Sequence, residues 1–136
     1  MADLKISDMT AIGTISGAES AECVQSGSNK QWTFADIAAW ILTPTINTQT
    51  GTSYTLQTVD NDGKTVVRMN NAASNTCTIP STQTKTVTVR QVGAGVTTLV
   101  AGAGVTLNGN LVFSGANYAK SIVPVSAGVY DVYGVQ

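Results

Sequence analysis

The sequence predicts a mainly β protein: an antiparallel β-sandwich or barrel with an extended N-terminal arm and one short α-helix. Charged residues make up only 11% of the 136-residue chain, and threonine, serine, asparagine and glutamine supply the rest of the polar surface. Threonine is β-branched and suits a pleated sheet. After residue 53, short runs rich in Val, Thr, Ile and Tyr alternate with turn residues. The chain length fits one such body plus a short appendage.

Residues 4–30 predict the extended arm. Small and polar residues dominate this segment, and its few apolar residues recur with neither the two-residue period of a strand nor the 3.6-residue period of a helix.

The helix is predicted at about residues 33–42. Thr33 can cap its N-terminus, Asp36 can complete the capping box three residues later, and Pro44 ends the segment. The apolar residues follow helical spacing along one stripe that contains Phe34, Ile37, Ala38 and Ile41.

Residues 43–53 have the Thr, Asn, Gly and Pro content of a linker. We therefore divide the chain into residues 1–52, which contain the arm, the helix and the linker, and a β domain at 53–136.

Within the β domain, antiparallel neighbours are expected, because no connection is long enough for a crossover helix. A repeated Gly-Ala-Gly-Val-Thr sequence, at 93–97 and 102–106, predicts two similar corners. Strands are predicted at 54–59, 65–70, 75–79, 85–91, 97–101, 105–107, 110–113, 118–125 and 129–133.

The sequence does not favour an enzyme, and we expect no catalytic residue, cofactor or metal site. It contains no histidine, which removes the Ser-His and Cys-His nucleophile pairs. Asp60 and Asp62 could act as paired carboxylates or as part of a calcium loop, but their Asp-Asn-Asp-Gly sequence predicts an exposed turn without the remaining ligands. Cys23 and Cys77 lack zinc-site spacing, and Cys77 suits a buried thiol in a strand.

The charge pattern limits the partners. The net charge is −1 and the seven basic residues form no cluster, so direct nucleic-acid binding is not expected. No segment approaches the roughly 18 apolar residues of a membrane span, and no signal peptide is recognised. We expect a protein made in the cytosol that assembles with other chains, since so little charge gives little mutual repulsion.

A helix of about ten residues is marginal alone in water, so it must dock on the β body, on a sister subunit or on another protein. The candidate contacts with a sister subunit or a larger shell are Trp32, Phe34, Ile37, Trp40 and Ile41. An alternative is an aromatic sugar platform, for which core or subunit-contact roles are preferred; its residues would be Trp32, Trp40, Tyr54, Tyr118, Tyr130 and Tyr133.

Several segments resemble a β module that recurs in virion proteins of tailed bacteriophages. They are NDGKTVVRMNN at 61–71, CTIP at 77–80, TVTVRQVGAG at 86–95, VTLNG at 105–109 and YDVYG at 130–134. The N-terminal region is similar to the start of many phage fibre and decoration proteins through ISD at 6–8, Glu19, VQSG at 24–27 and TFADI at 33–37, although Met9 stands where those proteins have proline.

This resemblance implies a structural protein of a bacteriophage particle. The chain's size favours a capsid decoration, or cement, protein that binds the outer shell as a homotrimer, contacts the major capsid protein and stabilises the virion. One alternative is a short tail or head fibre segment that binds host glycans. Another is a cellular carbohydrate-binding module, which predicts a monomer with a secretion signal or a catalytic partner domain.

Overall fold

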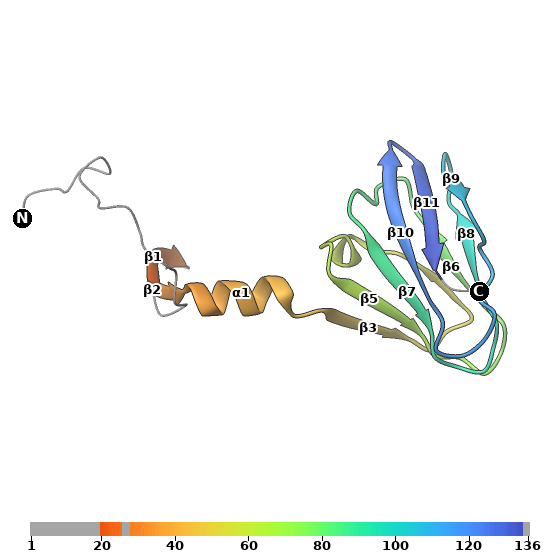
Figure 1. The fold of residues 1–136 in the computed structure, drawn as a ribbon, viewed down its shortest axis with the longest axis horizontal. Helices are drawn as coiled ribbons and strands as arrows, with labels where there is room; N and C mark the ends of the chain where they lie inside the picture. The colour runs from red at the N-terminus through yellow and green to blue at the C-terminus, as the bar shows by residue number, and fades with distance from the viewer. Residues whose placement is uncertain (1–19, 26–27, 135–136) are drawn as a thin grey trace, which may run out of the picture. The chain divides into compact units, whose positions relative to one another are not determined.

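The computed structural model describes residues 20–25 and 28–134, with side chains from residue 33 onward (Figure 1). The chain divides into two compact units, residues 1–42 and 43–136. The second unit therefore begins ten residues earlier than the boundary predicted from sequence.

The first unit contains a hairpin and a helix. Strands β1 (Ser20–Gln25) and β2 (Ser28–Thr33) pair antiparallel, from Ser20 opposite Thr33 to Gln25 opposite Ser28. The prediction of an extended arm is therefore wrong for the described part of this segment, while residues 4–19 and 26–27 lie outside the described residues. The strands SAECVQ and SNKQWT contain few apolar residues, so the hairpin leaves no two-residue apolar period in the sequence.

Helix α1 (Phe34–Leu42) confirms the helix prediction and its capping box. The Asp36 backbone N–H donates to Thr33 Oγ1 at 3.1 Å, and Asp36 Oδ2 accepts from the Thr33 backbone N–H at 3.0 Å and from its hydroxyl at 2.7 Å. These hydrogen bonds from Thr33, first its side chain and then its backbone, lower the pKa of Asp36 below the usual 3.8. Pro44 follows two residues after the helix ends.

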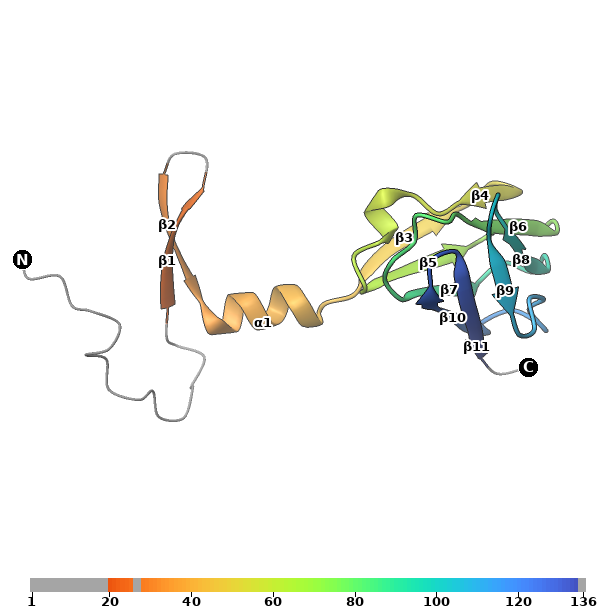
Figure 2. The same cartoon turned by 90° about the horizontal axis from the view of Figure 1, so that it is seen from above.

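The second unit begins with three similar coils, each made of one strand in a large sheet, a corner and one strand in a small sheet. Parallel partners in successive coils lie 20 to 23 residues apart, as shown by Thr45 opposite Thr65 and Ser53 opposite Thr76. The two sheets face each other (Figure 2). The coils are β3 (Thr45–Gln49) with β4 (Ser53–Thr55), β5 (Thr65–Met69) with β6 (Asn75–Ile79), and β7 (Val87–Gln91) with β8 (Thr97–Ala101).

Three further strands complete the unit: β9 (Thr106–Asn108), β10 (Ala119–Ser126) and β11 (Val129–Gly134). Strand β10 runs antiparallel to both β7 and β11, and β11 runs parallel to β9. The large sheet has the order β3-β5-β7-β10-β11-β9, and the small sheet has the order β4-β6-β8.

The mainly β prediction is confirmed, but the prediction of antiparallel neighbours is wrong for most of the unit. The pairs β3–β5, β5–β7, β4–β6, β6–β8 and β9–β11 are all parallel, in a solenoid-like arrangement. Parallel strands need a long crossover, and in the three coils that crossover contains a strand of the opposite sheet rather than a helix. Strand β3 lies inside the segment interpreted as a linker, which corrects that interpretation.

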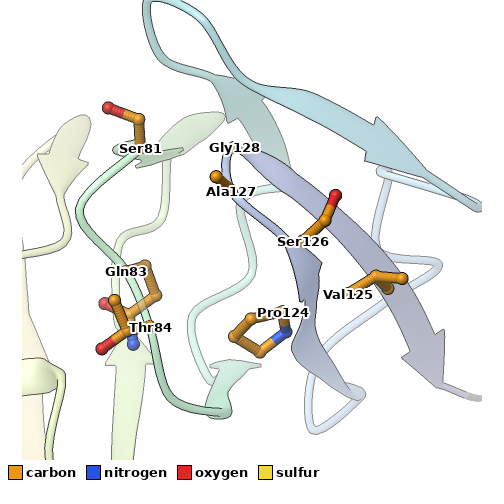
Figure 3. Close-up of a pocket in the computed structure, with 8 residues that line it drawn as sticks. All are labelled: Ser81, Gln83, Thr84, Pro124, Val125, Ser126, Ala127 and Gly128. Atoms are coloured by element: carbon orange, nitrogen blue, oxygen red, sulfur yellow. The ribbon is translucent and has the colours of Figure 1, made fainter.

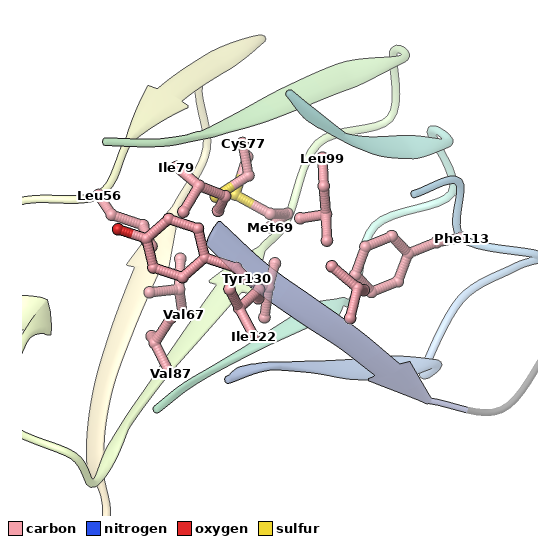
Figure 4. Packing of buried hydrophobic residues seen from close by; sticks show 12 residues of the cluster. Leu56, Val67, Met69, Cys77, Ile79, Val87, Leu99, Phe113, Ile122 and Tyr130 are labelled. Carbon is pink, nitrogen blue, oxygen red and sulfur yellow. The ribbon is translucent and has the colours of Figure 1, made fainter. Parts of the chain in front are cut away.

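The core lies between the sheets, where alternate residues of each strand point inward (Figure 4). Tyr130 from β11 lies among side chains of both sheets, and its hydroxyl donates to the carbonyl of Gln83 at 2.9 Å. Successive coils place inward side chains in register: Val67 pairs with Val89, and Cys77 with Leu99. The buried apolar residues are Leu56, Val67, Met69, Cys77, Ile79, Val87, Val89, Leu99, Phe113, Ile122, Tyr130 and Val132.

The two Gly-Ala-Gly-Val-Thr segments are both corners, as predicted. Gly93 lies against the backbone of Asn71 in the preceding coil, and Gly102 lies against the carbonyl of Ile79. The second glycines differ: Gly95 is crowded by the Ala73 carbonyl group, whereas Gly104 has open space around it and a φ of 71°.

Candidate assembly surfaces

Helix α1 is the most apolar exposed element of the described chain. Its sequence, FADIAAWIL, has Asp36 as its only polar residue, and none of its residues is buried. Trp40 is 66% exposed and Leu42 is 76% exposed. A helix that is apolar around its whole circumference belongs in a buried environment, and a large exposed apolar patch marks an interaction site.

The sequence-predicted contact residues concentrate on this helix. Phe34 and Ile37 are partly buried, whereas Trp40 and Ile41 are exposed. Trp32 belongs to β2, but its side chain lies outside the described residues.

The sequence analysis missed Leu42, the most exposed apolar side chain of α1. It lies at the end of the helix, four residues after Ala38, so the spacing of the predicted stripe would have included it.

A shallow hollow lies between the loop after β6 and the turn that joins β10 to β11 (Figure 3). Its volume is about 260 Å³. No lining residue has an acidic, basic or thiol side chain, so the hydroxyls of Ser81, Thr84 and Ser126 have no general base among the residues that line the hollow. The lining residues are Ser81, Gln83, Thr84, Pro124, Val125, Ser126, Ala127 and Gly128.

Asp60 corrects the prediction of an exposed acidic turn, because its side chain is fully buried. Its carboxylate accepts hydrogen bonds from the Tyr54 hydroxyl at 2.6 Å, the Asn47 amide at 2.7 Å and the Gln57 backbone N–H at 2.8 Å. A carboxylate held by three donors within the fold has a structural role and is not placed to attack a substrate.

The groups around Asp60 hold their protons strongly. Burial, together with the hydrogen bond to Asp60, raises the pKa of Tyr54 to about 12. Burial and the nearby charge of Asp60 likewise raise the pKa of Cys77 to about 12. Cys77 is therefore the buried, protonated thiol expected from sequence, and it lacks the thiolate character of a reactive cysteine.

Asp62, the second acidic residue of the turn, caps the start of β5. Burial opposes ionisation, but its Oδ1 accepts from the backbone N–H groups of Lys64 at 2.9 Å and Thr65 at 2.7 Å, and the net effect is a lowered pKa. The described residues contain no group of three acidic, cysteine or histidine side chains that could hold a metal ion.

The tyrosines of the second unit are not gathered into a sugar platform. Tyr130 is buried in the core, Tyr54 belongs to the Asp60 cluster and Tyr118 packs partly buried against the core. Tyr133 is the exposed tyrosine, at 58%.

Comparison with protein-family models and with curated protein sequences gives no match to this chain. Within the described part of the chain, no helix has the length and apolarity needed to cross a membrane.

Proposed function

We propose that this chain is a structural protein of a bacteriophage particle, a decoration protein that binds the outer capsid shell as a homotrimer and stabilises it. In this role the chain is not an enzyme. It binds other copies of itself and the major capsid protein on the virion surface. The observation that carries the proposal is helix α1, which has a single polar residue and no buried one.

A nine-residue helix gains too little from its own hydrogen bonds to be stable alone in water. Packing several copies side by side would remove Trp40, Ile41 and Leu42 from water, and each fully buried side chain of this size contributes about 1.5 to 3 kcal/mol. The net charge of −1 places little repulsion between copies. Burial of these apolar side chains therefore favours self-association through α1, and the low net charge does little to oppose it.

The second unit supplies a body with its own closed core, which suits an outward-projecting part of a surface protein. A protein that binds the assembled shell, and not its dissociated subunits, shifts the equilibrium towards the shell by mass action. Stabilisation thus follows from binding alone and needs no catalytic group.

The test begins with the solution mass of the full-length chain, measured by light scattering, and continues with co-sedimentation on shells that lack the protein. The expected result is a trimer that sediments with the shells and raises their rupture temperature. A monomer that ignores the shells would overturn the proposal.

A pair of matched variants locates the contact. Ile41→Asp places a charge on α1, whereas Val125→Asp places the same charge on an equally exposed position of the second unit, since these residues are 55% and 61% exposed. Ile41→Asp should abolish the trimer because a buried, unpaired carboxylate costs several kcal/mol. Val125→Asp should leave the trimer intact, and equal effects of the two variants would argue against α1 as the subunit contact.

A further inference from the structure

The two arginines of the chain, Arg68 and Arg90, lie side by side. Arg68 is in β5 and Arg90 is in β7, and they are direct partners in the parallel register of the large sheet. Both belong to the outward-facing set of their strands, because the residues on either side of each are buried. Their separation of 22 residues is one coil of the unit.

Nothing within the sheet neutralises this pair. The next residues along the same row are Thr48 on β3 and Ala119 on β10, so no carboxylate stands in register with either arginine. Like charges directly opposite each other on neighbouring strands are unfavourable. An arrangement that stabilises neither strand pairing nor the core requires another explanation.

The hydrogen bonds of the two guanidinium groups are incomplete. Arg90 donates from Nη2 to the Asn117 side-chain oxygen at 3.1 Å, which orients its planar group. The Nε atom of Arg68 is buried and has no hydrogen-bond partner. A buried charged donor without an acceptor is costly, so its retention at this position needs a reason.

Neighbouring strands are roughly 4.8 Å apart, so guanidinium groups that project from adjacent strands can converge on one oxyanion. Arginine presents its N–H donors in a rigid planar fork that matches the oxygens of a carboxylate or phosphate. Such an anion would accept from the terminal Nη groups of the two arginines and would cancel the repulsion between the two charges.

The row beside the arginines carries groups suited to a sugar. Thr88 on β7 and Ser121 on β10 are in register, with their hydroxyl oxygens 3.5 Å apart, and Tyr133 on β11 follows Ser121. The Tyr133 ring is 58% exposed and offers a flat apolar face, while the hydroxyls can exchange hydrogen bonds with those of a saccharide. Asp131 accepts the hydrogen bond of the Tyr133 hydroxyl and adds an outward-facing carboxylate two positions farther from the arginine row, which can accept from sugar hydroxyls but repels the carboxylates of an acidic peptide. An aromatic ring and hydroxyl groups next to a cationic pair therefore favour an acidic sugar over an acidic peptide.

We propose that the outer face of β5, β7, β10 and β11 binds a saccharide that carries an oxyanion, either a carboxylate or a phosphate ester. Arg68 and Arg90 bind the oxyanion, and the row containing Thr88, Ser121 and Tyr133 contacts the sugar ring. This site lies on the second unit and requires neither trimer formation nor shell binding, so its test is independent of the function proposed above.

The presence of two arginines allows a direct test by nuclear magnetic resonance on the full-length protein. At mildly acidic pH each arginine gives one Nε–H signal, and Arg68→Lys and Arg90→Lys assign the two signals by deletion. The probes are trigalacturonate, which carries carboxylates, mannose 6-phosphate, which carries a phosphate ester, and the neutral sugar maltotriose. Triglutamate at the same ionic strength reports on peptide carboxylates.

Both arginine signals should shift saturably with at least one of the two acidic sugars, and the tighter of these identifies the source of the oxyanion. Maltotriose should bind at least tenfold more weakly, because it cannot form the charge-assisted hydrogen bonds. Absence of saturable shifts with both acidic sugars would overturn the proposal. Equal binding of triglutamate would also overturn it, in favour of a protein carboxylate as the ligand.

Matched variants separate specific binding from general charge attraction. Arg90→Gln should weaken binding of the acidic sugar about tenfold or more, whereas Lys85→Gln, which removes one positive charge at an exposed position outside the arginine row, should change it less than twofold. Arg90→Lys keeps the charge but loses the planar fork, and should also weaken binding. If Lys85→Gln and Arg90→Gln weaken binding equally, the sugar does not bind at the arginine pair. Backbone amide spectra verify that each variant is folded.

Discussion

Asp60 belongs to a set of polar side chains that point inward from the first coil, β3 with β4. In the later coils the inward position in this row is valine, at Val67 and Val89, but in β3 it is Asn47. The first coil has no preceding coil to cover it, so its inward groups are polar and satisfy one another instead. Asp60, which accepts from Asn47 and Tyr54, is the common acceptor of that set.

The importance of this carboxylate can be measured with Asp60→Ala. Its removal leaves three donors without an acceptor, so the free energy of unfolding should fall by about 2 to 4 kcal/mol. Asp131→Ala is the matched control, because Asp131 accepts from the exposed side chains of Asn108 and Tyr133 and should cost less than about 1 kcal/mol. Urea unfolding followed by circular dichroism measures both variants, and equal losses would contradict a special role for Asp60.

The burial of Asp60 could not be read from its local sequence. Asp-Asn-Asp-Gly has the composition of an exposed turn, and the turn is there, but the donors to Asp60 come from residues 13 and 6 positions earlier, Asn47 and Tyr54. Burial of Cys77 was predictable because its own strand alternates Thr-Cys-Thr-Ile. Local alternation thus reveals a buried apolar residue more readily than a buried polar one.

At the level of elements, the corners between strands hold the coils in contact. Gly95 lies in the corner between β7 and β8, and its backbone N–H donates to the Asn71 carbonyl of the preceding coil at 3.0 Å. A Cβ atom at this position would overlap the Ala73 carbonyl group. The corner therefore requires glycine because of close backbone approach and not because of backbone conformation.

Gly95→Ala should accordingly lower the free energy of unfolding by about 3 kcal/mol or more, because the two corners must separate. Gly51→Ala is the comparison, since a Cβ there would come no closer than 3.4 Å to the Ser53 carbonyl oxygen. We expect that change to cost less than about 1 kcal/mol. Similar unfolding midpoints for the two alanine variants would show that the corner contact is not tightly packed.

Most of the elements could be predicted, but their pairing could not. The strands at 75–79 and 97–101 were placed correctly because each alternates, whereas β3 was missed because its inward residues include Asn47 and Gln49. The segment at 110–113 was predicted as a strand but forms only a single bridge, from Val112 to Thr98. The 22-residue spacing of Arg68 and Arg90 was a sign of stacked coils that the strand-by-strand interpretation did not use.

At the level of the whole molecule, the chain combines two units with different requirements. The second unit encloses twelve buried apolar residues, whereas helix α1 of the first has none. The second unit should therefore be stable without the first, and the first should depend on association. This division is the structural basis for assigning assembly to α1.

A fragment of residues 43–136 tests this division. It should fold as a monomer, and its unfolding free energy should lie within about 1 kcal/mol of that of the same unit in a full-length Ile41→Asp chain, because the core is complete within it. Light scattering and urea unfolding provide the two measurements. A fragment that trimerises would show that the second unit contains a subunit contact of its own.

The position of β10 and β11 in the large sheet also determines when the protein can fold. Ile122 and Tyr130, from the last strands, are buried in the same core as Val67 from the second coil. During synthesis, the earlier coils therefore leave the ribosome before the strands that cover them, and the apolar interior stays open until β10 and β11 have emerged. Because such distant contacts form slowly, we expect the unit to fold in one step after β11 is available rather than coil by coil.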